Sequence, residues 1–123
     1  MAGIKPRISV EYSKNATIVT FTEERILKDE DTQALQESIM SVVESAGGRI
    51  NLILDFCNVR FLSSAVLGLL MRVSKRIYER DGQLRLCNID PKIYEIFKIT
   101  RLTKIFYIYE DIERATQSLS GPD

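Results

Sequence analysis

The sequence predicts an α/β fold: a single-domain mixed β-sheet with helices packed on it. Residues 50–56 are nearly all apolar, which is typical of a central strand buried on both faces. Residues 7–21 contain two β-rich runs separated by a turn signal, which predicts an opening hairpin. Apolar residues recur at helical spacing between the later strand-like runs. The 123 residues fit one domain, and we expect the order β-β-α-β-α-β-α-β-α.

The first half begins with strands at 7–13 and 16–21, joined at Lys14-Asn15. Residues 23–28 connect these strands to a helix and carry no clear pattern of their own. The acidic run at 29–32 offers several N-cap residues and suits the positive end of a helix dipole. The helix is expected to end at Gly47-Gly48.

The second half alternates strands with helices, so parallel strand pairs are expected. A helix is predicted from about residue 64 to 80, then a strand at 83–87 and a short helix after Asp90-Pro91, which read as N-cap and N1. A strand at 105–109 and a helix at 111–119 complete the chain. The apolar stripe of the helix near 64–80 comprises Val66, Leu69, Leu70, Val73 and Ile77. We expect a domain over residues 7–117, with flexible termini at 1–6 and 118–123. The sequence leaves open which sheet face each helix covers.

The composition excludes several classes of function. Seventeen basic and seventeen acidic residues balance, so direct nucleic-acid binding is not expected. There is no histidine, and Cys57 and Cys87 lie far apart, so we expect no metal and no cofactor. Both cysteines stand in apolar, strand-like contexts and are expected to be small buried residues. The first residues lack the apolar region of a signal peptide, and no apolar run is long enough to span a membrane. We expect a soluble cytoplasmic domain.

Nothing in the sequence predicts an enzyme. Without histidine, no Ser-His-Asp or Cys-His arrangement can form within the chain. Gly47-Gly48 precedes Arg49-Ile50 rather than Lys-Ser/Thr, so it is not a P-loop. Asp55 ends the central strand, where side chains often face a ligand, but turn chemistry before Asn58 is the preferred interpretation.

Ser63 and Ser64 stand where the chain turns from strand to helix. A serine there can cap the helix, or it can carry a phosphate, because unpaired N–H groups and a partial positive charge favour both. We expect Ser63 to be the cap. Ser64 is predicted to be either a phosphate acceptor or an ordinary first residue of the helix, and its position does not decide between them.

Residues 61–70, Phe-Leu-Ser-Ser-Ala-Val-Leu-Gly-Leu-Leu, resemble the core motif of STAS domains, the anti-sigma factor antagonist family. The usual motif has Phe, an aliphatic residue, Asp, Ser, Ser/Thr, Gly, Leu and Gly, followed by two apolar residues. The resemblance extends over roughly residues 7–117. It includes the strands at 52–56 and 83–87 and the segments 91–97 and 102–106.

The resemblance implies a non-enzymatic regulator that binds an anti-sigma factor or serine kinase. In this family the partner phosphorylates a serine at the start of the second helix, and the phosphate disrupts binding. By position in the motif, the acceptor is Ser64. We expect the partner-binding residues to be Asn58, Arg60, Ser63, Ser64 and Arg72.

Three residues around Ser64 depart from the motif. Ser63 replaces the acid, Ala65 replaces Ser/Thr, and Val66 replaces glycine, where its branched side chain is expected to hinder a partner. These departures favour an alternative, a constitutive STAS subunit of a larger assembly without a phosphoswitch. A stressosome-like scaffold or a lipid-transport ATPase complex would be such an assembly. A small-molecule or nucleotide binder ranks last, because the turn has no phosphate-cradling glycines.

Overall fold

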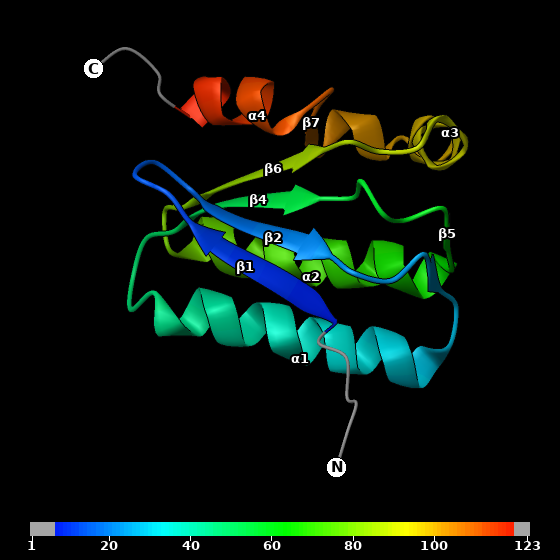
Figure 1. Cartoon of the computed structure of the whole chain (residues 1–123), viewed down its shortest axis with the longest axis horizontal. Coiled ribbons are helices and arrows are strands. Elements are labelled where there is room, and N and C mark those ends of the chain that lie inside the picture. Colours follow the sequence, from blue (N-terminus) through cyan, green and yellow to red (C-terminus); the bar gives the residue numbers. More distant parts are fainter. Residues whose placement is uncertain (1–6, 120–123) are drawn as a thin grey trace.

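The computed structural model describes residues 7–119 (Figure 1). Its strands are β1 (Ile8–Tyr12), β2 (Thr17–Phe21), β3 (Arg25–Ile26), β4 (Asn51–Asp55), β5 (Phe61–Leu62), β6 (Gln83–Cys87) and β7 (Tyr107–Tyr109). Its helices are α1 (Asp29–Ser45), α2 (Ser64–Glu79), α3 (Pro91–Ile99) and α4 (Ile112–Leu119), with a 3₁₀ turn, η1, at Leu102–Lys104. The predicted α/β fold class is confirmed.

A five-stranded sheet in the order β1-β2-β4-β6-β7 forms the centre of the domain. The predicted hairpin is present, with β1 antiparallel to β2, and every other neighbouring pair in this sheet is parallel. β4 occupies the middle position, and Leu52, Ile53 and Leu54 are fully buried. The apolar run therefore marks a central strand, as predicted.

The two sheet faces are covered unequally. Figure 1 shows α1 and α2 lying side by side and parallel on one face, with α4 on the opposite face. Successive right-handed crossovers from β2 to β4 and from β4 to β6 advance in the same direction, which places both helices on one face. The main core lies beneath these helices, and the predicted stripe of α2 is fully buried in it. A smaller cluster beneath α4 comprises Ala16, Ile18, Ile53, Cys87 and Ala115.

The start of α3 and the end of α1 follow the predicted chemistry, whereas the start of α1 does not. Asp90 accepts a hydrogen bond from Lys92 N at 2.9 Å, with Pro91 as the first helical residue, so the predicted cap is confirmed. α1 ends before Gly47, whose φ of 71° suits glycine. The expected acidic N-cap of α1 is wrong, because Lys28 holds that position without a side-chain cap. The acids from Asp29 to Asp31 instead lie in the first turn, where they complement the helix dipole.

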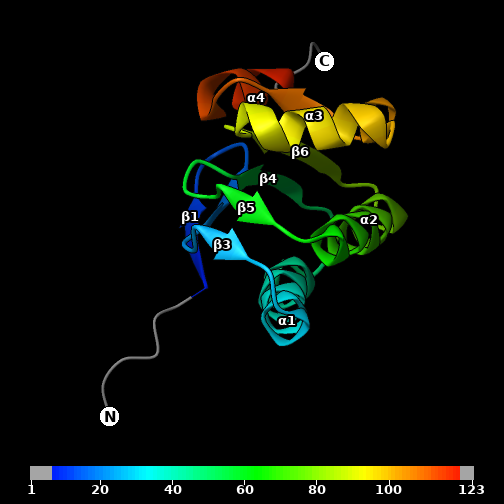
Figure 2. The same ribbon diagram turned by 90° about the vertical axis from the view of Figure 1, so that its right-hand side faces the viewer.

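The segment to which the sequence assigned no element forms part of a second, two-stranded sheet. β3 pairs in parallel with β5, and Arg25 stands opposite Phe61. The pairing joins residues about 36 positions apart in strands of two residues each, too short for alternation to be visible in sequence. Figure 2 looks onto this end of the molecule, where the small sheet lies beside the first turns of α1 and α2.

The last strand is shorter than predicted. Residues 102–104 form η1, Phe106 is buried beside it, and β7 begins at Tyr107. Of the expected flexible termini, residues 1–6 and 120–123 lie outside the described residues. Ser118 and Leu119 belong to α4, and Ser118 Oγ accepts a hydrogen bond from Arg85 Nε at 2.8 Å. No helix within residues 7–119 combines the length and apolar character needed to cross a membrane.

Candidate functional site

The connection from β4 to α2 is held by side-chain hydrogen bonds at the carboxyl end of the sheet. Asp55, buried at 4% exposure, accepts from Cys57 N at 3.0 Å and from Asn88 Nδ2 at 2.9 Å. It therefore closes a turn and ties the end of β4 to the residue after β6. This confirms the turn interpretation of Asp55 over a ligand-facing one.

Asn58 and Arg60 hold the outer part of the same connection. Asn58 Nδ2 donates to the Phe21 carbonyl at the end of β2, at 3.0 Å. Arg60 Nη1 donates to the Cys57 carbonyl at 3.3 Å and lies 3.9 Å from a carboxylate oxygen of Asp90. Both residues are exposed, so they are open to a partner while they fix the turn.

Cys57 is exposed in this turn, so the expectation that both cysteines are buried is wrong for it. The strand ends at Asp55, and the chain turns before Cys57 can enter the core. Partial burial, followed by the nearby charge of Asp55, raises the pKa of the Cys57 thiol. Cys87 is fully buried, as predicted.

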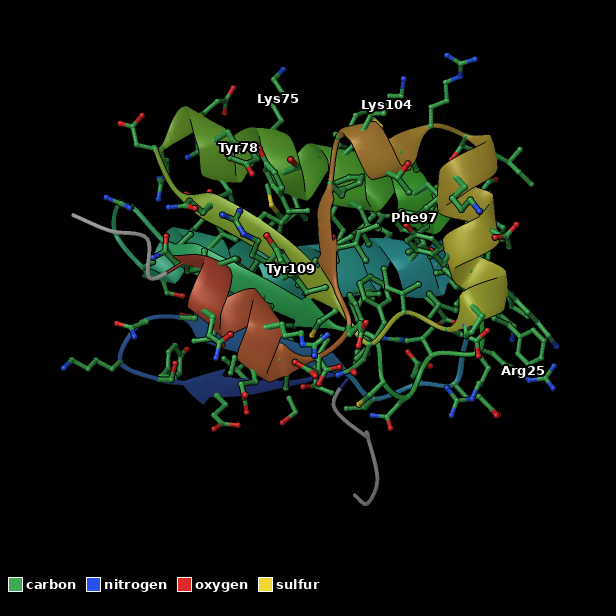
Figure 3. The ribbon with its side chains drawn as sticks, turned by 90° about the horizontal axis from the view of Figure 1, so that it is seen from above. Arg25, Lys75, Tyr78, Phe97, Lys104 and Tyr109 are labelled. Atoms are coloured by element: carbon green, nitrogen blue, oxygen red, sulfur yellow. The ribbon has the colours of Figure 1, made fainter. Side chains whose placement is uncertain are left out.

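The small sheet and the residue that follows β3 present three exposed side chains beside the serines, which we call the end ribbon: Arg25, Leu27 and Phe61. The Arg25 guanidinium lies 4.6 Å from the centre of the Phe61 ring, and Figure 3 shows Arg25 projecting from this end of the molecule. Phe61 is 42% exposed and Leu27 is 49% exposed. Exposed apolar side chains beside a cation are typical of binding surfaces.

Sequence reasoning missed the end ribbon. The paired apolar residues Ile26-Leu27 and Phe61-Leu62 were its signal in the sequence. Only the pairing of β3 with β5, extended by the bond from Ser63 N to the Ile26 carbonyl at 3.0 Å, places these segments together.

Ser63 occupies the N-cap position of α2, but it is not the predicted side-chain cap. Its backbone is extended, and its carbonyl accepts from Val66 N at 3.0 Å. Its hydroxyl forms no cap bond and is a buried oxygen that has no hydrogen-bond partner in the described part of the chain. The expected cap stabilisation is therefore absent, because the Oγ is not directed at the free N–H groups.

Ser64 is the first residue of α2 and is exposed. Its hydroxyl has no hydrogen-bond partner within residues 7–119, and the first turn of α2 contains no acidic residue. Val66, expected to hinder a partner, is instead fully buried in the main core. That expectation is wrong, because Val66 points away from the surface that carries Ser64.

A groove of about 360 Å³ separates the first turns of α1 and α2. Its lining consists of Asp29, Thr32, Gln33, Gln36, Ala65 and Arg72. Arg72 Nε donates to Gln36 Oε1 at 2.8 Å, so this side chain bridges the two helices. Another hollow, beside α3 and β7, is lined by none of the predicted site residues.

Four of the five predicted partner-binding residues, Asn58, Arg60, Ser63 and Ser64, lie in the connection from β4 to α2 and the first turn of that helix. Arg72 lies two turns along α2 on the side that faces α1. Within residues 7–119, no three histidine, cysteine, aspartate or glutamate side chains gather where they could hold a metal ion. The arrangement offers an exposed hydroxyl at a helix start beside an apolar and cationic surface.

Comparison with known proteins identifies this architecture. The family model for the STAS domain matches residues 7–115. The chain belongs to the STAS domain family. BtrV of Bordetella bronchiseptica, a protein assigned to the anti-sigma factor antagonists, is 26% identical over 90 residues, which are 73% of this chain and 76% of BtrV. This STAS domain is therefore antagonist-like and belongs to a group of non-enzymatic regulators.

Solved structures agree with the STAS fold. An anti-sigma-factor antagonist domain protein from Planctomyces limnophilus superposes with a TM-score of 0.83 at 21% identity, covering 93% of this chain and 98% of that one. An anti-sigma factor antagonist from Mycobacterium paratuberculosis gives a TM-score of 0.77 at 23% identity, covering 93% of each chain. At these identities, the two structures establish the fold.

Proposed function

We propose that this STAS domain is an anti-sigma factor antagonist whose Ser64 end binds an anti-sigma factor with serine kinase activity. The observation that carries the proposal is the exposed Ser64 hydroxyl at the start of α2, which forms no hydrogen bond with residues 7–119. The similarity to BtrV supports the class of partner. The end ribbon supplies the apolar contact area that a protein partner requires, and the exposed residues Asn58 and Arg60 lie in the connection that precedes Phe61.

Phosphorylation of Ser64 would control this binding. The kinase transfers the γ-phosphoryl group of ATP to Ser64 Oγ: the new O–P bond forms as the bond to ADP breaks, and the hydroxyl proton passes to a base of the kinase. The phosphate adds a charge of about −1.5 to −2. The start of a helix tolerates this charge, whereas a closely packed interface must desolvate or repel it.

Ser64→Glu is expected to weaken partner binding at least about tenfold while leaving the free energy of unfolding nearly unchanged. The carboxylate interacts favourably with the helix dipole by about 0.3–1 kcal/mol, less than a buried unpaired charge costs at an interface. The partner is first recovered from the native host with the wild-type domain and identified by mass spectrometry. Its affinity for the variants is then measured by calorimetry, and stability by urea titration.

Two further variants make this test specific. Ser64→Ala should bind like wild type and accept no labelled phosphate from ATP and the partner. Ser41→Glu adds the same charge to an exposed position of α1 and should change neither property. If Ser64→Glu binds like wild type, the phosphoswitch is wrong.

The second candidate function is a constitutive subunit of a larger assembly, such as a stressosome-like scaffold or a lipid-transport ATPase complex. Ser63 and Ala65 favour it, because they replace the acid and the hydroxyl residue that flank the acceptor serine in the family motif. Under this function, wild type and Ser64→Glu recover the same stable complex. Protein isolated from the host then carries no phosphate at Ser64.

A further inference from the structure

Three residues of α2, the first of which is Ser64, are spaced along one side of the helix. Gly68 follows Ser64 by four residues and Arg72 by eight, so all three lie towards one side of the helix. Side chains of a helix lean towards its N-terminus. The Arg72 side chain therefore reaches back along α2 in the direction of Ser64.

The geometry at Gly68 locates the end of the Arg72 side chain. A Cβ atom built on Gly68 would lie 3.3 Å from Arg72 Nη1 and 3.9 Å from Nη2. The guanidinium thus lies over bare backbone, one helical turn from Ser64. Glycine inside a helix costs about 1 kcal/mol relative to alanine. Here Gly68 places no side chain on the helix surface between the Ser64 hydroxyl and the Arg72 guanidinium.

Arg72 also differs from the neighbouring arginines in its partners. Arg76 and Arg80 form ion pairs with Glu44 at 2.6 and 2.8 Å. Arg72 donates to the neutral Gln36 amide and has no carboxylate within ion-pairing distance among residues 7–119. Arg72 lines the groove beside Ala65, and its two terminal nitrogens form no hydrogen bond with residues 7–119.

We propose that Arg72 is the phosphate-pairing residue of this site: when Ser64 is phosphorylated, its guanidinium forms charge-assisted hydrogen bonds with the phosphate across Gly68. The inference rests on the proposed function in one respect: it requires that Ser64 is phosphorylated. It does not depend on which kinase transfers the phosphate. Asp29 lines the same groove and opposes the phosphate charge. Arg72 therefore determines whether the phosphate is stabilised on the domain's own surface.

The test installs phosphoserine at position 64 during translation by stop-codon suppression, so no kinase is required. Phosphorus NMR then measures the second pKa of the phosphate, which is ordinarily about 6. A paired cation favours the doubly charged form and lowers this pKa. Because Arg72 is exposed and screened, Arg72→Ala is expected to raise the pKa by about 0.3–0.7 unit.

Matched variants separate pairing from general charge. Lys75→Ala removes one cation from the next turn of α2, where Figure 3 shows Lys75 projecting into solvent, and should leave the pKa unchanged. Gln36→Glu should raise the pKa by giving Arg72 a competing carboxylate.

Equal pKa values in the parent and in Arg72→Ala would overturn the proposal and leave Arg72 as a link between α1 and α2. A Lys75→Ala shift as large as that of Arg72→Ala would also overturn it. Circular dichroism of each variant verifies the fold. Absence of phosphate on Ser64 in the host would contradict the proposed function without changing this titration, so the two failures are distinguishable.

Discussion

At the scale of single residues, two N-cap positions of this domain show that a capping residue type does not guarantee a capping bond. Asp90 accepts a hydrogen bond from Lys92 N at the start of α3. The Ser63 hydroxyl at the start of α2 is buried and forms no bond. A cap stabilises a helix only when its oxygen reaches a free N–H group, so the two side chains contribute differently.

Ser63→Ala is therefore expected to leave the free energy of unfolding within about 0.5 kcal/mol of wild type, or to raise it slightly. Removing a buried hydroxyl that has no partner removes its desolvation cost. Asp90→Ala, the control, should lose about 0.5–2 kcal/mol because it breaks an existing cap. Urea titration of both variants is the measurement. A loss of about 1 kcal/mol or more in Ser63→Ala would mean that its hydroxyl caps α2 after all.

At the scale of elements, α2 joins the core to the candidate site. Its stripe, from Val66 to Ile77, is buried against the sheet, while Ser64 and Arg72 are exposed on the same helix. The packing of this stripe fixes the rotation of α2 and therefore the direction in which Ser64 points. The positions of Ser64 and Arg72 on the surface therefore depend on how the buried stripe of α2 packs against the sheet.

Leu69→Ala is expected to lower the free energy of unfolding by about 2–4 kcal/mol, and Val73→Ala by somewhat less. Both side chains are fully buried, and truncation leaves a cavity that the packed sheet cannot close. Met71→Ala, on the same helix but 45% exposed, should cost much less. Chemical denaturation measures all three. Unchanged midpoints for Leu69→Ala and Val73→Ala would mean that α2 faces the sheet differently.

At the scale of the whole molecule, the two sheet faces have different chemistry. The face beneath α1 and α2 is apolar, whereas the face beneath α4 buries Cys87 and the charged Arg85. Arg85 bonds to Ser118 and Gln83 and lies 4.6 Å from the centre of the Tyr107 ring. Burial, followed by the charge of Asp55, raises the pKa of the Cys87 thiol from 9.0 to about 12.

This shift predicts a loss of stability in alkali. The folded state holds the Cys87 proton more tightly than the unfolded state. The contribution of the protonated thiol to the free energy of unfolding is therefore fully present below pH 9 and is lost as the pH rises towards 12. The slope is at most about 1.4 kcal/mol per pH unit. Urea titration at pH 8.5 and 10.5 should show a smaller loss in Cys87→Ala than in wild type. Cys57→Ala, which removes an exposed thiol, should retain most of the loss. Equal losses in wild type and Cys87→Ala would contradict the shift.

The sequence by itself determined the fold class, the order of the larger elements and the buried face of α2. These properties follow from local periodicity, and the apolar stripe of α2 and the run in β4 both span enough residues to show it. The motif around Ser64 likewise indicated the family and the start of a helix, because motif spacing is local information.

Only the tertiary structure decided what surrounds Ser64. The end ribbon exists because β3 pairs with β5 across a long separation, and strands of two residues carry no readable pattern. The Ser63 hydroxyl has no hydrogen-bond partner within residues 7–119, because its oxygen is not directed at the free N–H groups of α2. The Arg72 guanidinium lies beside Gly68, where a glycine leaves space, and Gln36 of a second helix accepts a hydrogen bond from it. Each of these depends on contacts between distant segments, which local periodicity does not encode.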